Sequence, residues 1–141
     1  MMYANGNTKS NSKKRIIIVS TGGTIAMVKK GREVVPFDIG NSLVTDIPGL
    51  QEIADAELFE FSNIPSPSMT PSLMWELAKK IDDFLENKGY DGAVVTHGTD
   101  TLEETAYFLD LVLRTEKPVV ITASMRNISE LSTDGPRNVL S

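Results

Sequence analysis

Residues 16–27 read IIIVSTGGTIAM, a run of branched apolar side chains that stops abruptly at hydroxyls and two glycines. Continuous apolar character, as in Ile16–Val19, is typical of a strand buried on both faces of a parallel sheet. Glycine permits positive φ and lets another backbone or a ligand approach closely. The stretch therefore predicts a core strand whose exit loop lies near a functional site.

Further strands alternate with helices along the chain. Thr70 and Pro71 are expected as the N-cap and first position of a helix that Gly89 ends, and Thr101 with Glu104 predicts a capping box at the start of a second helix. The later strands are expected at 56–64, 92–98 and 119–123, all of them in the sheet and the last one buried. This alternation predicts an α/β fold with a doubly wound, mostly parallel sheet in a three-layer, flavodoxin- or Rossmann-like arrangement.

The other segments predict less regular structure. Residues 1–14 are expected to be a disordered polar tail, which leaves 15–141 as one α/β domain. Residues 29–40 predict a mobile loop or a short hairpin, and 41–55 at most a short helix stopped by Pro48-Gly49.

The C-terminal end of the sequence is unusual. Asp134 and Pro136 are typical of a helix start, yet only five residues follow the proline. An isolated helix of this length is not stable in water. We therefore expect the chain to be the front part of a longer protein, with its C-terminal part absent.

Composition excludes several classes of function. The net charge is −5 and no basic stripe is present, which argues against a nucleic-acid partner. The chain has no cysteine and its carboxylates do not cluster at ligand spacing, so no metal site is predicted. The apolar run 16–19 is too short for a signal peptide and no segment is long enough to span a membrane, so the protein is expected to be cytoplasmic.

Two strand exits carry reactive side chains to the edge of the sheet where ligands bind, STGGTIA at 20–26 and THGTDTLEET at 96–105. Threonine supplies a nucleophile, neighbouring amides can stabilise an oxyanion, and a helix start keeps the Asp100 carboxylate ionised. Structural interpretations stay open beside these. The glycines are also typical of a tight turn or a phosphate cradle, Asp100 of a helix cap, and His97, the single histidine, of a structural residue rather than a base.

Taken together, TGGTIA and the later HGTDTLEETAYFLDL resemble two signatures of the bacterial L-asparaginase/glutaminase family. The segment ASMRNISELSTDGPRNVLS, residues 123–141, is similar to a third stretch of that family. The resemblance runs from about Arg15 to Ser141, so it covers nearly all of the chain beyond the tail and implies the family's N-terminal α/β domain.

The resemblance also implies roles for individual residues. Thr24 matches the family's nucleophile, and Thr99 and Asp100 match a pair that works with a lysine further along the chain. Ser66 matches a serine that holds the substrate's α-carboxylate, Pro67 is its neighbour in the substrate site, and Asp100 also matches the position that binds the α-ammonium group. The implied reaction converts L-asparagine to L-aspartate and ammonia through an acyl-enzyme, with no metal or organic cofactor.

Two positions depart from the family pattern. The family usually has a tyrosine in the loop after TGGTIA, whereas residues 27–40 contain none and Phe37 is their single aromatic side chain. Pro67 stands where many members carry a polar side chain. The missing tyrosine leaves open whether another residue closes the site or the loop works differently, and Pro67 leaves open the preference between asparagine and glutamine.

The expected lysine lies past Ser141, so this piece alone is expected to be inactive. Family members are typically dimers or tetramers, which implies a homodimer or homotetramer for the whole protein. Two alternatives remain: a non-catalytic amino-acid-binding module, and the glutamine-hydrolysing subunit of a transfer-RNA-dependent amidotransferase.

Overall fold

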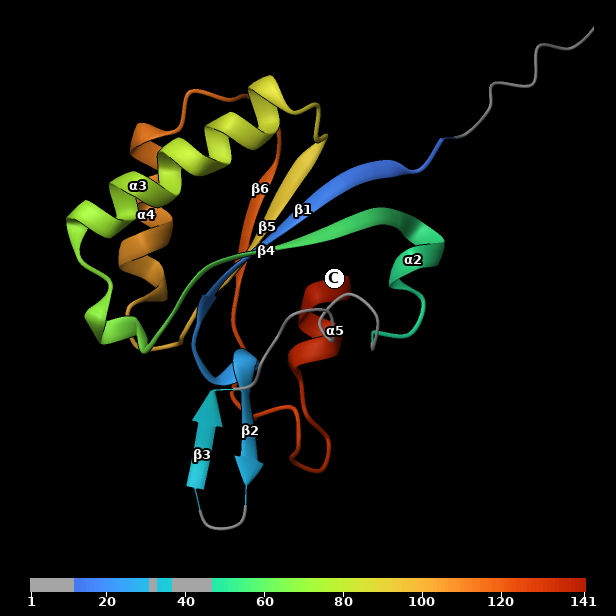
Figure 1. Ribbon diagram of the computed structural model, residues 1–141, viewed down its shortest axis with the longest axis vertical. Helices are drawn as coiled ribbons and strands as arrows, with labels where there is room; N and C mark the ends of the chain where they lie inside the picture. The colour runs from blue at the N-terminus through green and yellow to red at the C-terminus, as the bar shows by residue number, and fades with distance from the viewer. Residues whose placement is uncertain (1–11, 31–32, 37–46) are drawn as a thin grey trace, which may run out of the picture.

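A computed structural model describes residues 12–30, 33–36 and 47–141. A four-stranded sheet with the order β4-β1-β5-β6 forms its centre (Figure 1). The strands of this sheet are β1 Lys14–Gly22, β4 Ala54–Ile64, β5 Gly92–Thr96 and β6 Val119–Thr122. Every neighbouring pair is parallel, which confirms the predicted doubly wound parallel sheet.

The order of the strands indicates where on the sheet a ligand would bind. The chain passes from β1 to β4 on one side, then crosses to β5 and β6 on the other side of β1. Strand order therefore reverses between β1 and β5, and in open α/β sheets ligands bind at the carboxyl ends of the strands at such a point. The exits of β1 and β5 are the two loops whose side chains are predicted to be reactive.

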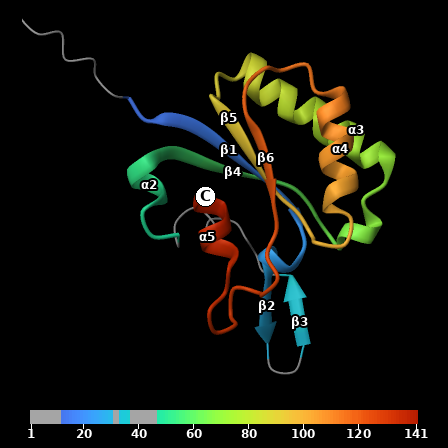
Figure 2. The same ribbon diagram turned by 180° about the vertical axis from the view of Figure 1, so that it is seen from behind.

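Helices cover both faces of the sheet, which gives the predicted three layers (Figures 1 and 2). The helices α3 Pro71–Asp82 and α4 Leu102–Val112 lie on one face, and α2 Leu50–Ile53 and α5 Gly135–Leu140 lie on the other. No helix in the part of the chain that the structure describes has the length and apolar character needed to cross a membrane.

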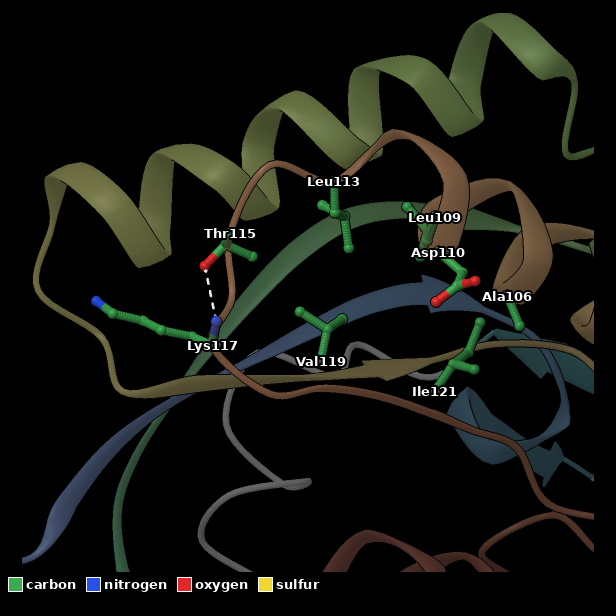
Figure 3. Close-up of a pocket in the computed structure, with 8 residues that line it drawn as sticks. All are labelled: Ala106, Leu109, Asp110, Leu113, Thr115, Lys117, Val119 and Ile121. Carbon is green, nitrogen blue, oxygen red and sulfur yellow. Dashed lines mark hydrogen bonds between the residues drawn. The ribbon is translucent and has the colours of Figure 1, made fainter.

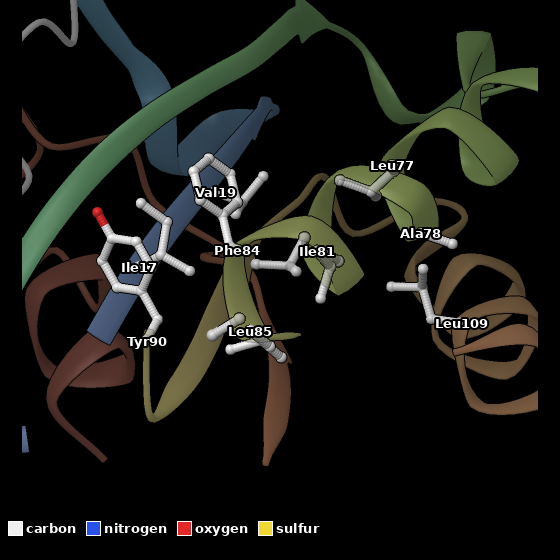
Figure 4. Close-up of a cluster of buried hydrophobic side chains, with 11 residues drawn as sticks. Ile17, Val19, Leu77, Ala78, Ile81, Phe84, Leu85, Tyr90 and Leu109 are labelled. Carbon is white, nitrogen blue, oxygen red and sulfur yellow. The ribbon is translucent and has the colours of Figure 1, made fainter. Parts of the chain in front are cut away.

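The apolar character of β1 follows from burial on both faces. Ile17 and Val19 pack against Leu77 and Ile81 of α3 in the larger core cluster (Figure 4). Ile18 points to the opposite face and joins a second cluster that includes Leu50 and Val139. Full burial of one such aliphatic side chain contributes about 1.5–3 kcal/mol. Burial on these two faces explains why positions 16–19 of the strand are all apolar.

The predicted helix after Thr70 is confirmed. The Thr70 hydroxyl accepts a bond from the backbone N–H of Leu73 at 3.3 Å, and Pro71 occupies the first turn. The helix continues as the π-helical turn η3, Asp83–Asn87, and ends before Gly89, whose φ is +75°. Local capping and a left-handed glycine therefore set both ends of this helix.

The prediction that 119–123 is a buried strand is wrong about its burial. β6 forms at Val119–Thr122, but Val120 is 54 % exposed and Val119 and Ile121 are only partly buried. β6 is the outer strand of the described sheet, because it pairs with β5 on one side only. An apolar run alone does not reveal whether a strand is central or at an edge.

The segment between β1 and β4 differs in part from expectation. β2 Met27–Lys30 and β3 Glu33–Pro36 pair antiparallel, which agrees with the predicted short hairpin. The short helix was expected before Pro48-Gly49, whereas α2 begins directly after them at Leu50. Gly49 has φ +83° and its carbonyl accepts from the Glu52 N–H at 3.0 Å, so it starts the helix rather than ending one. Residues 37–46 lie outside the described residues, as do 1–11 of the predicted tail.

Asp82 joins α3 to the segment that follows α4. Its buried carboxylate accepts from the backbone N–H groups of Arg114 and Thr115 at 3.1 and 3.2 Å, and from Nε of Arg114 at 3.3 Å. Asp82→Ala should lower the free energy of unfolding by about 1–3 kcal/mol, because two backbone donors lose their acceptor.

Arg114→Ala is the matched control for Asp82→Ala. The Arg114 side chain is 83 % exposed, so its ion pair should contribute at most about 1 kcal/mol. Urea denaturation of both variants tests the difference. Equal losses would mean that the exposed ion pair, and not the backbone bonds, carries the effect.

Candidate active site

Three loops meet at the carboxyl edge of the sheet and form a small pocket of about 150 Å³. The loops follow β1, β4 and β5. The lining residues are Gly23, Thr24, Pro65, Ser66, Gly98, Thr99 and Asp100. The pocket thus brings together four of the predicted site residues, whereas Pro67 is absent from its lining and lies exposed in the short 3-10 helix η2, Ser66–Ser68.

Two glycines allow the β1 exit to reach the β5 exit. Gly22 and Gly23 have φ values of +112° and +82°, which L side chains rarely adopt. A Cβ atom added at Gly23 would lie 2.6 Å from both Cα and N of Gly98. The backbones of Gly23 and Gly98 therefore pack directly against each other. The chain then turns into the 3-10 helix η1, Thr24–Ala26, which sets Thr24 at the pocket.

Hydroxyl groups just below the pocket tie the three strand ends together. Oγ1 of Thr21 donates to the carbonyl of Thr96 at 2.9 Å, which links β1 to β5. Oγ of Ser62 donates to the carbonyl of Thr21, also at 2.9 Å, which links β4 to β1. These bonds fix the strand ends, and therefore the loops that leave them.

Ser66 is the contact between the β4 exit and the β5 exit. It is 4 % exposed, and its Oγ accepts from the backbone N–H of Asp100 at 3.2 Å. Its carbonyl accepts from Oγ1 of Thr101 at 2.8 Å. A hydroxyl that accepts a bond still has its own proton to donate, so Ser66 can also bind an anionic group in the pocket.

The capping box predicted at Thr101 does not form. Thr101 is the N-cap of α4 by position, but its side chain makes no capping bond, and its hydroxyl is directed at the carbonyl of Ser66, to which it donates. Ser and Thr hydroxyls choose between local backbone partners and other acceptors of similar strength. Here the hydroxyl of Thr101 bonds the carbonyl of Ser66, and this bond holds the start of α4 against the β4 exit.

The polar groups around the pocket can bind a small zwitterion and attack it. Thr99 and Asp100 are exposed and Thr24 is partly buried, so all three are open to a ligand. Asp100 lies two residues before α4, near the positive end of the helix dipole. A carboxylate suits a cationic group, the Ser66 hydroxyl suits an anionic one, and two threonine hydroxyls lie beside them.

Sequence reasoning missed a buried threonine beneath the pocket. Thr105 of α4 is fully buried, and its Oγ1 lies 3.0 Å from Nε2 of His97, which is also fully buried. The helical spacing contained a signal, because Thr105 follows Leu102 by three positions and precedes Leu109 by four. It therefore shares the inward face that those leucines define.

The third stretch of the resemblance, residues 123–141, comprises the loop after β6 and helix α5. The carboxylate of Asp134 accepts from the backbone N–H groups of Met125 and Arg126, each at 3.0 Å, and from Nδ2 of Asn138. The bond from Met125 in particular holds the pKa of Asp134 below its usual range. Asp134 therefore clamps this loop to the start of α5.

A larger pocket of about 270 Å³ lies between α4 and β6, away from these loops (Figure 3). Its walls include Leu109, Leu113 and Ile121, and none of the predicted site residues lines it. Its lining also contains the polar residues Asp110, Thr115 and Lys117, and Nζ of Lys117 donates to the carbonyls of Leu85 and Tyr90. Phe37, the single aromatic residue of 27–40, lies outside the described residues.

Comparisons with known proteins agree with the fold and with these motifs. The family "Asparaginase, N-terminal" matches residues 15–141. L-asparaginase 2 of Bacillus subtilis is 41 % identical over 88 % of this chain, and the glutaminase-asparaginase of Acinetobacter glutaminasificans is 37 % identical over 92 %. The crystal structure of a probable cytoplasmic L-asparaginase from Campylobacter jejuni superposes with a TM-score of 0.82, at 42 % identity over 90 % of this chain.

The chain is much shorter than these relatives. It covers 34 % of the Bacillus protein, 40 % of the Acinetobacter protein and 40 % of the Campylobacter chain. The match to residues 15–141 nevertheless includes all three strand exits that form the pocket. The chain therefore belongs to the asparaginase family, and its matched residues correspond to the family's N-terminal region.

Proposed function

We propose that this chain supplies the nucleophile-bearing part of an L-asparagine amidohydrolase, which produces L-aspartate and ammonia. The observation that carries the proposal is the convergence of Thr24, Ser66, Thr99 and Asp100 on one small pocket in a chain of this family. Residues 15–141 form the α/β domain of that enzyme, and the activity belongs to the longer protein.

The proposed reaction proceeds in two steps. Oγ of Thr24 attacks the side-chain carboxamide carbon, a base takes the hydroxyl proton, and ammonia leaves with a proton as the acyl-enzyme forms. Water then attacks the ester and releases L-aspartate, which restores the Thr24 hydroxyl. A threonine hydroxyl is a weak nucleophile at neutral pH, so the base is essential. We assign that role to a lysine that the longer protein supplies after Ser141, working with Thr99 and Asp100.

The other pocket residues orient the substrate. The Asp100 carboxylate binds the α-ammonium group, and the Ser66 hydroxyl donates to the α-carboxylate. The Asp100 N–H that bonds Ser66 keeps these two groups at a fixed spacing. Pro67 follows Ser66 in the chain but does not line the pocket, and its ring offers a substrate no side-chain hydrogen bond. L-glutamine is the second candidate substrate, and the name of the Acinetobacter relative supports it.

The surroundings that we propose follow from the same comparisons. The name of the Campylobacter relative supports a cytoplasmic enzyme. The acidic net charge supports a small-molecule substrate over a nucleic acid. We further propose that the longer protein is a homodimer or homotetramer.

An ammonia-release assay on two proteins tests the proposed function. The 141-residue chain alone should show no turnover, because it lacks the base. A chimera in which residues 15–141 replace the matching region of Bacillus subtilis L-asparaginase 2 should hydrolyse L-asparagine, with L-glutamine as the comparison substrate. A folded chimera that binds L-aspartate by calorimetry but releases no ammonia would contradict catalysis and indicate a binding module.

A further inference from the structure

His97 joins the pocket to the interior of helix α4. Its ring is fully buried, with Nδ1 2.8 Å from the carbonyl oxygen of Gly98 and Nε2 3.0 Å from Oγ1 of Thr105. We propose that His97 and Thr105 are positioning residues, which hold the loop Gly98–Asp100 through a single imidazole tautomer. The catalytic part of this inference rests on the proposed function, whereas the tautomer and the loop position do not.

The hydrogen-bond chemistry selects the tautomer. A carbonyl oxygen only accepts, so Nδ1 must carry a proton to bond Gly98. In the neutral ring Nε2 is then an acceptor, and the Thr105 hydroxyl donates to it. The result is a directed chain from Thr105 through the ring to the Gly98 carbonyl. Each bond fixes the tautomer that the other needs.

A displacement of the Gly98 backbone would disturb both neighbouring loops, because each of them packs against it. A Cβ atom at Gly23 would lie 2.6 Å from Gly98 N, and one at Gly98 would lie 2.7 Å from Oγ of Ser66. The loops that carry Thr24 and Ser66 therefore both rest on the Gly98 backbone. The bond from Nδ1 fixes the plane of the Gly98–Thr99 peptide, and through it the direction of the Thr99 side chain.

His97 and Thr105 are themselves held in place by backbone structure. The backbone N–H of His97 donates to the Thr122 carbonyl at 2.9 Å, which ties the residue to β6. Thr105 lies in α4, one turn after the helix start that bonds Ser66 through Thr101. The helix thus bonds the β4 exit at its N-cap and holds the β5 exit through the imidazole. An aliphatic residue in place of His97 would fill the volume but not hold the carbonyl.

The single histidine of the chain makes the tautomer directly measurable. Long-range ¹H–¹⁵N correlation spectra of the ¹⁵N-labelled 141-residue chain at neutral pH contain one imidazole and need no assignment of other rings. We expect the pattern of a neutral ring protonated at Nδ1. A pattern with the proton on Nε2, or with rapid averaging of both tautomers, would overturn the inference.

Variants of Thr105 test the positioning role. Thr105→Val keeps the shape and removes the donor, whereas Thr105→Ser keeps the hydroxyl. The valine variant should shift the backbone amide signals of Gly98 and Thr99 and broaden the tautomer pattern, and the serine variant should restore both. If the valine variant does not fold, Thr105→Ala removes the donor without added bulk and should give the same shifts. Unchanged amide signals in the folded variant would overturn the inference.

Kinetics of the chimera separate positioning from general packing. Thr105→Val should lower kcat for L-asparagine about tenfold or more with a smaller change in KM, because misplacement of a reacting group acts mainly on the chemical step. Thr105→Ser should recover most of this loss. Equal kcat in all three proteins would overturn the positioning role. An inactive parent chimera would count against the proposed function, and the spectra of the 141-residue chain would still decide the inference.

Discussion

Gly23→Ala should destabilise the fold by about 2–5 kcal/mol and abolish ligand binding at the pocket. Two costs add in this estimate. An alanine at φ +82° costs about 1–2 kcal/mol, and forced displacement of packed neighbours costs about 1–3 kcal/mol more. The displaced neighbour is the Gly98 backbone, which cannot rotate away as a flexible side chain can.

Gly49→Ala is the matched control for the first cost alone. Gly49 has φ +83°, nearly the same as Gly23, but a Cβ atom there meets nothing within 4 Å. We expect a loss of about 1–2 kcal/mol, with the pocket unchanged. Thermal or urea unfolding of both variants measures the difference. Similar losses at the two positions would show that the contact between Gly23 and Gly98 is looser than the structure indicates.

Thr24→Ala in the chimera should lower kcat for L-asparagine by roughly 10⁴- to 10⁶-fold, the size of effect expected when a nucleophile is removed. The methyl group of alanine cannot attack the carboxamide, so the proposed acyl-enzyme cannot form. The expected change in the free energy of unfolding is small, because Thr24 is only partly buried and its backbone path is set by the preceding glycines.

Thr24→Ser separates the hydroxyl from the rest of the threonine side chain. It keeps a nucleophile but loses the methyl group that restricts χ1, so it should retain measurable turnover at a reduced rate. Ammonia release with a coupled assay, together with L-aspartate binding by calorimetry, measures both functions. If Thr24→Ala retains turnover while it stays folded, the nucleophile is a different residue, and Thr99 is then the first to test.

Local sequence patterns predicted much of the framework. Ile16–Val19 indicated the central strand, and its burial on two faces is what the uninterrupted apolar run required. Thr70 and Gly89 set the ends of the long helix, because a cap and a left-handed glycine act within one turn. The resemblance directed attention to Thr24, Ser66, Thr99 and Asp100, which the structure gathers at one pocket.

Other features had no local signal. The apolar residues of β6 were expected to be buried, but Val120 is largely exposed, since burial of a strand depends on its neighbours. Thr101 was expected to cap its own helix, but its hydroxyl bonds a carbonyl that lies 35 positions away in the sequence. Gly49 was expected to end a helix and starts one instead, because the conformation of a glycine does not reveal on which side the helix lies.

The sequence by itself determined the strand–helix alternation and the glycine-rich strand exits, because each depends on residues within a few positions of one another. The family resemblance, and not a local pattern, pointed to the side chains that we propose as reactive. Only the tertiary structure decided which hydroxyls face each other across the loops, that Gly98 supports both Thr24 and Ser66, and that His97 is paired with Thr105. These contacts join segments that lie far apart in the sequence. A Ser or Thr hydroxyl can bond several backbone partners with similar energy, so the order of the strands decides which partner is close enough.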